Sequence, residues 1–125
     1  MKLVALLAIS ALLLLGCAKS RNVAGDFEQV LAGSVPQKNV PVFLDCVTDQ
    51  FRDRTLGLGV TILHRQQRRS NGYRVELVND EIGPMLSADI YDDGQVELYE
   101  TTYFSRFRVK TEREGFAACL AKFQK

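Results

Sequence analysis

The sequence predicts an α+β fold of two layers, in which a four-stranded antiparallel sheet is flanked by N- and C-terminal helices bridged by a disulfide. Three observations predict it. Apolar residues recur every three or four positions at both ends of the domain, as on one face of a helix. Between residues 58 and 103 they alternate with polar residues, which indicates strands. Cys46 and Cys119 fall on the inward faces of the two helical segments.

The chain begins with the features of a secretory signal. Met1 and Lys2 precede an apolar run, Leu3–Leu15, that is shorter than the roughly 20 residues a membrane-spanning helix needs. The run ends at Gly16 and Cys17, close to where such a signal is cleaved. We therefore expect residues 1–16 to be a removed signal peptide rather than a membrane helix.

The end of this signal resembles the lipobox of bacterial lipoproteins, carried by Leu14, Leu15, Gly16 and Cys17. The resemblance implies cleavage before Cys17, a diacylglycerol on its sulfur and an acyl chain on its new amino group. The diacylglycerol and the amide-linked chain together provide three acyl chains. Stable membrane anchoring needs only two such lipid chains, or one chain and a basic patch. The alternative is an ordinary secretory signal with an incidental cysteine. The mature domain resembles no family that we recognise.

The lipoprotein resemblance also bears on location. It implies a domain anchored in the bacterial cell envelope and facing the periplasm. The residue after Cys17 is Ala18 rather than aspartate, which resembles lipoproteins sorted to the outer membrane. Lys19 and Ser20, in contrast, resemble a signal that retains lipoproteins in the inner membrane. We favour the outer membrane.

Residues 17–38 are interpreted as a lipidated tether and residues 39–125 as one small domain. Within the tether, Phe27, Val30 and Leu31 would share one face of a two-turn helix over residues 26–32, with Asp26 as its cap. The chain has 16 Lys and Arg against 15 Asp and Glu. Removal of the signal peptide takes away Lys2, so the side chains of the mature protein have a net charge of about zero. No overall electrostatic field therefore attracts nucleic acid.

The first helix of the domain is predicted over residues 40–54. Phe43, Cys46, Val47 and Phe51 share one face, and Pro41 suits the first turn, where its missing N–H is not needed. Cys46 therefore points inward. An exported pair of cysteines in an oxidising compartment usually bonds, so we expect Cys46 and Cys119 to form a structural disulfide.

Two hairpins are predicted in the centre of the chain. In the first, a two-residue turn at Asn71 and Gly72 would mix polar and apolar faces, so we expect a longer exposed loop over residues 65–72. In the second, residues 92–94 form the loop, with Gly94 left-handed. This register sets Ile90 opposite Val96 and Ala88 opposite Leu98. The other face then carries four residues: Asp89, Tyr91, Glu97 and Tyr99.

Thr111 and Glu114 have the spacing of a capping box for a last helix. The apolar stripe of this helix consists of Phe116, Cys119, Leu120 and Phe123.

Signals for chemistry are weak. His64 is the only histidine, and no serine, aspartate or cysteine spacing near it suggests a nucleophile with its base, so we expect no enzymatic activity and no cofactor. Four residues match an EF-hand loop: Asp89, Asp93, Gly94 and Glu100. Tyr91 departs from that pattern where an oxygen ligand is expected. Asp89, Asp93 and Glu100 are therefore only weak calcium candidates, and no metal site is predicted.

Charge is segregated along the chain. Arg65, Arg68 and Arg69 crowd one loop, a second basic group includes Arg106 and Arg108, and acidic residues gather on the second hairpin. Each group on its own is more simply a solvated surface. Tyrosines beside carboxylates are typical of interface anchors.

These signals together predict a non-enzymatic lipoprotein that binds another envelope protein, as an accessory or assembly factor, an inhibitor or an immunity protein. The expected contact residues are Asp89, Tyr91, Glu97 and Tyr99. The alternative is binding of a small ligand or calcium at the second hairpin.

Overall fold

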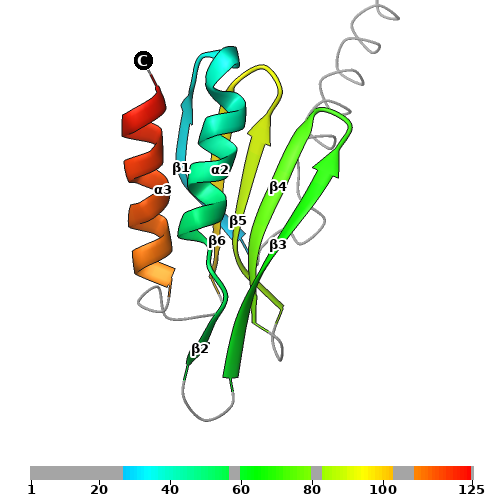
Figure 1. The fold of residues 1–125 in the computed structure, drawn as a ribbon. Helices are drawn as coiled ribbons and strands as arrows, with labels where there is room; N and C mark the ends of the chain where they lie inside the picture. The colour runs from blue at the N-terminus through cyan, green and yellow to red at the C-terminus, as the bar shows by residue number, and fades with distance from the viewer. Residues whose placement is uncertain (1–26, 57–59, 80–82, 103–108, 125) are drawn as a thin grey trace, which may run out of the picture.

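The computed structural model describes residues 27–56, 60–79, 83–102 and 109–124. One antiparallel sheet, with strand order β1-β6-β5-β4-β3-β2, carries helices α2 and α3 on the same face (Figure 1). The elements follow in chain order: β1 Phe27–Ser34, η1 Gln37–Asn39, α2 Val40–Gln50, β2 Arg54–Leu56, β3 Val60–Arg69, β4 Gly72–Asn79, β5 Gly83–Tyr91, β6 Gln95–Thr101 and α3 Lys110–Phe123. The α+β class is thus confirmed. The predicted four strands are too few, because the sheet contains five long strands and the short β2.

Strand β1 replaces the two helical turns predicted from residue 26 to residue 32. It pairs antiparallel with β6, and its register shifts between Gln29 and Leu31. The bulge interrupts the alternation, so that Phe27 lies opposite Thr101 and Leu31 opposite Leu98, on different faces of the sheet. Their spacing in the sequence resembles one face of a helix, but they do not share a face. The sheet therefore includes residues 27–34, and the predicted boundary between tether and domain at residue 39 is too late.

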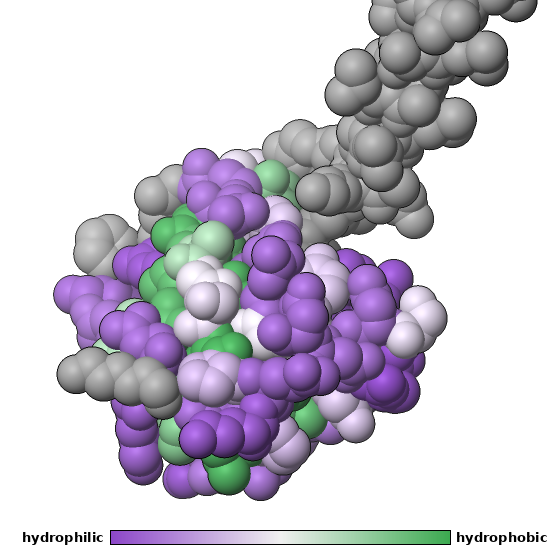
Figure 2. Space-filling view, turned by 90° about the horizontal axis from the view of Figure 1, so that it is seen from above, coloured by the Kyte–Doolittle hydropathy of each residue, from purple (hydrophilic) through white to green (hydrophobic). Residues whose placement is uncertain are grey.

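The β3–β4 hairpin has a tight turn, so the long loop predicted over residues 65–72 is wrong. Arg69 lies opposite Gly72, which leaves two residues in the turn. Gln66 then faces Val75, and the polar and apolar faces do mix. This is tolerated because β3 is exposed from Leu63 to the turn, so its polar side chains lose no water. From above, hydrophilic residues dominate the side of the molecule on which this hairpin lies (Figure 2).

The β5–β6 hairpin matches the prediction. Ile90 lies opposite Val96 and Ala88 opposite Leu98, and all four side chains are buried. Gly94 has a φ of 97°, and its N–H donates to the carbonyl of Tyr91 across the three-residue loop. Local turn chemistry and alternation were sufficient here because both act between neighbours in the sequence.

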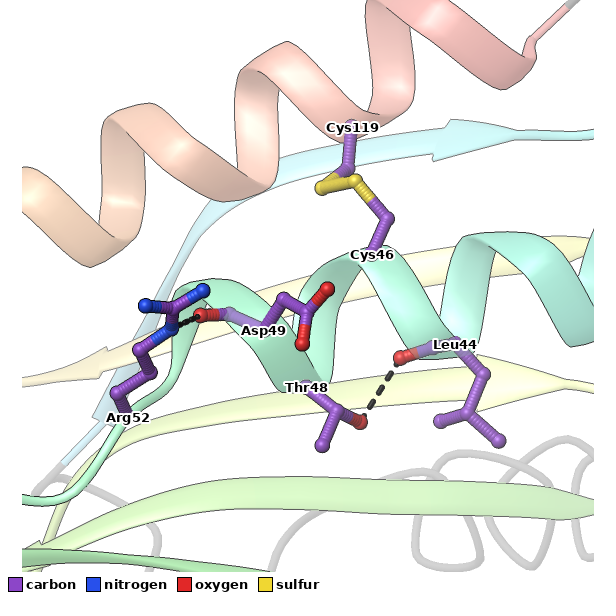
Figure 3. The surroundings of a disulfide bond; sticks show 6 residues. All are labelled: Leu44, Cys46, Thr48, Asp49, Arg52 and Cys119. Atoms are coloured by element: carbon purple, nitrogen blue, oxygen red, sulfur yellow. Dashed lines mark hydrogen bonds between the residues drawn. A yellow bond between two sulfur atoms is a disulfide. The ribbon is translucent and has the colours of Figure 1, made fainter.

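The core lies between the sheet and the two helices. Phe43 of α2 and Phe116 of α3 meet edge to face, with ring centroids 5.5 Å apart. The Cys46–Cys119 disulfide joins the same helices, with Cα atoms 5.9 Å apart (Figure 3). The predicted disulfide between the two helices is thus confirmed.

The start of α3 differs from the prediction. Val109 is the N-cap residue and makes no side-chain capping bond, so Thr111 lies inside the helix and the capping box is wrong. Val109 is only 2% exposed. Burying this side chain in the core starts the helix earlier than the local signal would place it.

Candidate protein-binding surface

The face of the sheet opposite the helices is polar. We call the polar and tyrosine residues at the outward positions of four adjacent strands the polar face: Arg65, Gln67, Arg74, Glu76, Ser87, Asp89, Tyr91, Glu97 and Tyr99. The apolar pair Leu63 and Val78 lies on the same side, toward the other end of β3 and β4. Alternation places these side chains on one side of the sheet. In β4, β5 and β6 the residues between them are mostly buried in the core, whereas in β3 they are exposed. Within the described part of the chain, both α-helices pack on the other side (Figure 1).

Ion pairs hold the polar face together across the strands. Arg74 Nε donates to Asp89 Oδ1 at 2.8 Å, and Arg65 donates to Glu76 Oε1 at 2.7 Å. Burial lowers the pKa of Arg74, but the hydrogen bond and charge of Asp89 outweigh it and raise the pKa above its usual value. The first pair joins β4 to β5 and the second joins β3 to β4, so each constrains the side chains that it connects.

All four residues predicted to contact a partner lie on this face. Tyr91, Glu97 and Tyr99 are partly exposed, and the Tyr99 hydroxyl donates to the Glu97 carboxylate. Asp89 is only 6% exposed and paired with Arg74, so it supports the surface from within.

Sequence reasoning missed the arginines of the polar face. Asp89 does lie opposite Glu97, as predicted, but Arg74 on the other neighbouring strand balances the acidic pair. The alternation of Arg74 and Glu76 in β4 was a visible signal. The sequence did not show which strand would lie beside β4, or in which register the two strands would pair.

The residues that match an EF-hand loop lie in the β5–β6 hairpin, which is the structure predicted for this segment. Asp89 points to the polar face, whereas Glu100 lies on the helix face, where Arg113 donates to it at 2.8 Å. Asp93 accepts from the backbone N–H of Gln95. The three weak calcium candidates therefore do not converge, and no group of three possible metal ligands occurs among the described residues.

His64 contacts an aspartate at the edge of the sheet. Its backbone N–H and its Nδ1 both lie within hydrogen-bond distance of Asp53 Oδ1, at 2.7 and 2.8 Å. The backbone hydrogen bond, followed by the side-chain one, lowers the pKa of Asp53 below its usual 3.8. The pair is exposed and has a structural role, joining the segment before β2 to β3.

The tips of the two hairpins are joined by an ion pair. Arg68 holds Asp92 through two hydrogen bonds, of 2.8 and 3.1 Å, and lies over the ring of Tyr73. The basic and acidic groups that looked separate in the sequence are thus partly paired. The other basic group consists of Arg106, Arg108, Lys110 and Arg113. Arg106 and Arg108 lie outside the described residues, whereas Lys110 lies 3.8 Å from Glu114 and Arg113 pairs with Glu100.

The Arg68–Asp92 pair leads to a testable titration. Its hydrogen bonds lower the pKa of Asp92 below the usual 3.8, so the pair stabilises the folded state above that pH and is lost as the pH falls through the lower value. We expect carboxyl NMR to show Asp92 titrating below 3.8, and Arg68→Ala to return it toward 3.8. Arg69→Ala, at the neighbouring position, is the control. A normal titration of Asp92 in the unaltered protein would contradict the pair.

Comparison with known proteins finds no relative. No family model matches the chain, and neither a curated protein nor a solved structure matches it. The residues that resemble a lipobox, with Cys17, lie outside the described part, as does Leu58 of the alternating pattern. No helix within the described residues is long and apolar enough to cross a membrane.

Proposed function

We propose that this chain is a lipid-anchored bacterial lipoprotein that faces the periplasm, preferentially on the outer membrane, and binds another envelope protein through its polar face. Its role is that of an accessory or assembly factor, an inhibitor or an immunity protein. The binding is non-enzymatic and needs no cofactor.

The anchoring half of the proposal rests on Leu14–Cys17, which follow a short apolar run. The Cys46–Cys119 disulfide supports it, since disulfides persist in oxidising compartments such as the periplasm. Residues 18–26 would separate the lipid from β1, and nine extended residues span about 30 Å at most. The domain would therefore stay close to the membrane surface.

The binding half is carried by one observation: Tyr91, Glu97 and Tyr99 lie partly exposed on one sheet face. The Tyr99 hydroxyl donates to the Glu97 carboxylate there, and the Arg74–Asp89 pair joins β4 to β5 beside them. Tyrosine buries a large amphipathic area at low cost in side-chain entropy. A surface that is already ordered loses little freedom on binding. Such a face suits a protein partner better than a small ligand, because the residues are spread over neighbouring strands.

The test is co-purification with a matched pair of variants. The tagged, lipidated protein is isolated from mildly solubilised envelopes. We expect one stoichiometric partner, recovered at least tenfold less with the Tyr91→Ala/Tyr99→Ala variant, since interface anchors commonly contribute about 2 kcal/mol or more each. Val42→Ala, which shortens a side chain 46% exposed on α2, is the control and should retain the partner. Equal recovery with both variants would overturn the polar face as the binding surface.

A further inference from the structure

Strand β3 has an unpaired edge over its outer half. Its partner β2 is three residues long and pairs only with Val60–Ile62. From Leu63 to Arg69, β3 pairs with β4 on one side, and no described strand lies on the other. An unpaired edge of this kind is a template for an additional strand.

The direction of the backbone groups along this edge follows from His64. Its N–H donates to Asp53 Oδ1 at 2.7 Å, so it points away from β4. Hydrogen-bonding directions alternate along a strand. The N–H and C=O groups of Gln66 and Arg68 therefore also point outward, and a tight turn closed by Arg69 opposite Gly72 agrees with this alternation.

The side chains beside the edge lean away from it. Gln66 is held on the helix side by the hydroxyl of Thr48, which also donates to the Leu44 carbonyl (Figure 3). Arg65 reaches across to Glu76 on β4, and Arg68 reaches to Asp92. Among the described residues, none is recorded as a hydrogen-bond partner of the outward backbone groups of Gln66 and Arg68, whereas the outward N–H of His64 is held by Asp53.

The charge of this edge is basic. Arg65 and Arg68 keep about half of their side-chain surface exposed, 49% and 53%, although both are paired. Arg69 is exposed and forms no ion pair with another described residue. An open hollow of about 670 Å³ lies at the tip, lined by Gln67, Arg68, Arg69 and Ser70.

These charges argue against a second copy of the chain as the occupant. One antiparallel register through the outward groups sets Gln66 opposite Gln66 of the other copy and Arg68 opposite His64, whose N–H is already held by Asp53. The next register sets Gln66 of one copy opposite Arg68 of the other. That register also sets Arg65 opposite Arg69 twice, and like charges directly opposite one another destabilise a sheet. A strand with carboxylates at alternate positions would meet the same arginines favourably.

We propose that the outer edge of β3, Arg65–Arg69, binds an extended acidic segment of a partner protein by adding it to the sheet as a further strand. Backbone hydrogen bonds to Gln66 and Arg68 supply the pairing, and Arg69 supplies the preference for carboxylates. This mode of recognition uses the main chain for affinity and alternate side chains for specificity. It is a second site, separate from the polar face.

The test is peptide binding to the full-length chain in neutral detergent micelles, measured by fluorescence anisotropy. The probe is a short labelled peptide of alternating valine and glutamate. We expect it to bind at least tenfold more tightly than the peptide with lysine in place of glutamate. N-methylation of alternate peptide amides should abolish binding, because it removes the donors that a strand needs while keeping the side chains. An N-methylated peptide that binds equally well would overturn strand addition.

Variants identify the residues. Arg69→Glu should reverse the preference between the two peptides, while the charge reversal Lys122→Glu on α3 should change neither affinity. The Tyr91→Ala/Tyr99→Ala variant should bind the peptide normally, which separates this site from the proposed partner surface. An unchanged preference in Arg69→Glu would overturn the proposal. So would failure of the acidic peptide to bind while added phosphatidylglycerol shifts the Arg68 and Arg69 amide signals, since the arginines would then bind lipid headgroups.

Discussion

Replacing Cys46 and Cys119 together with alanine should lower the free energy of unfolding by about 4 kcal/mol. The disulfide spans 73 positions, and closing a loop of this length in the unfolded chain gives about that value in the chain-entropy model. The helices keep the Phe43–Phe116 contact, so the variant should still fold. Denaturant unfolding, with and without reductant, measures the difference.

The controls for this result use the same helix. Thr48→Ala on α2 removes only the bonds to Leu44 and Gln66 and should cost about 1 kcal/mol or less. Reductant should destabilise the unaltered protein but leave the double variant unchanged. If the double variant unfolds at the same denaturant concentration as the original, or if the original contains free thiols, the stabilising role of the disulfide is disproved.

Replacing Cys17 with alanine should move the protein from the membrane fraction to the soluble fraction. Each buried methylene contributes about 0.8 kcal/mol to membrane binding, so losing three acyl chains removes the anchor entirely. Fractionation followed by immunoblotting measures the distribution, and mass spectrometry of the N-terminal peptide detects the lipid.

The double cysteine variant of the domain is the matched control, because it changes two other cysteines and leaves Cys17 in place. It should stay in the membrane fraction. A Cys17→Ala protein that remains membrane-bound would disprove the lipoprotein proposal, as would an unmodified Cys17 in the unaltered protein. Neither result would bear on the fold, which depends on residues after the tether.

The helices and the β5–β6 hairpin could be predicted from the sequence because local signals agree there. In α2, Phe43, Val47 and Phe51 repeat at helical spacing and are fully buried. In the hairpin, Gly94 and the alternation around it specify turn and register together. For the candidate surface, the same hairpin placed Tyr91 and Tyr99 correctly on one face.

Prediction failed where a distant partner decided the structure. Strand β1 imitates a helix because a bulge against β6 interrupts its alternation. Gly33 within it leaves room for α3, since a Cβ there would lie 2.7 Å from a methyl carbon of Leu120. The β3–β4 turn was misplaced because the exposure of β3 depends on where the helices end. Neither the residues of β1 nor those of β3 show in their local sequence that a bulge or an exposed strand will form there.

The sequence by itself determined the two helices, the pairing of their cysteines and the face on which the hairpin tyrosines lie. The helices and the hairpin face follow from periodicity and turn chemistry over a few residues, and the cysteine pairing follows from the inward position of an exported pair. Only the tertiary structure decided that β1 joins β6, that Arg74 pairs with Asp89, and that the pairing of β2 with β3 ends at Ile62, so that no described strand pairs with the rest of that edge of β3. The physical reason is that strand order and register depend on contacts between segments far apart in the chain, and hydrogen bonds between strands can form in several registers until packing selects one.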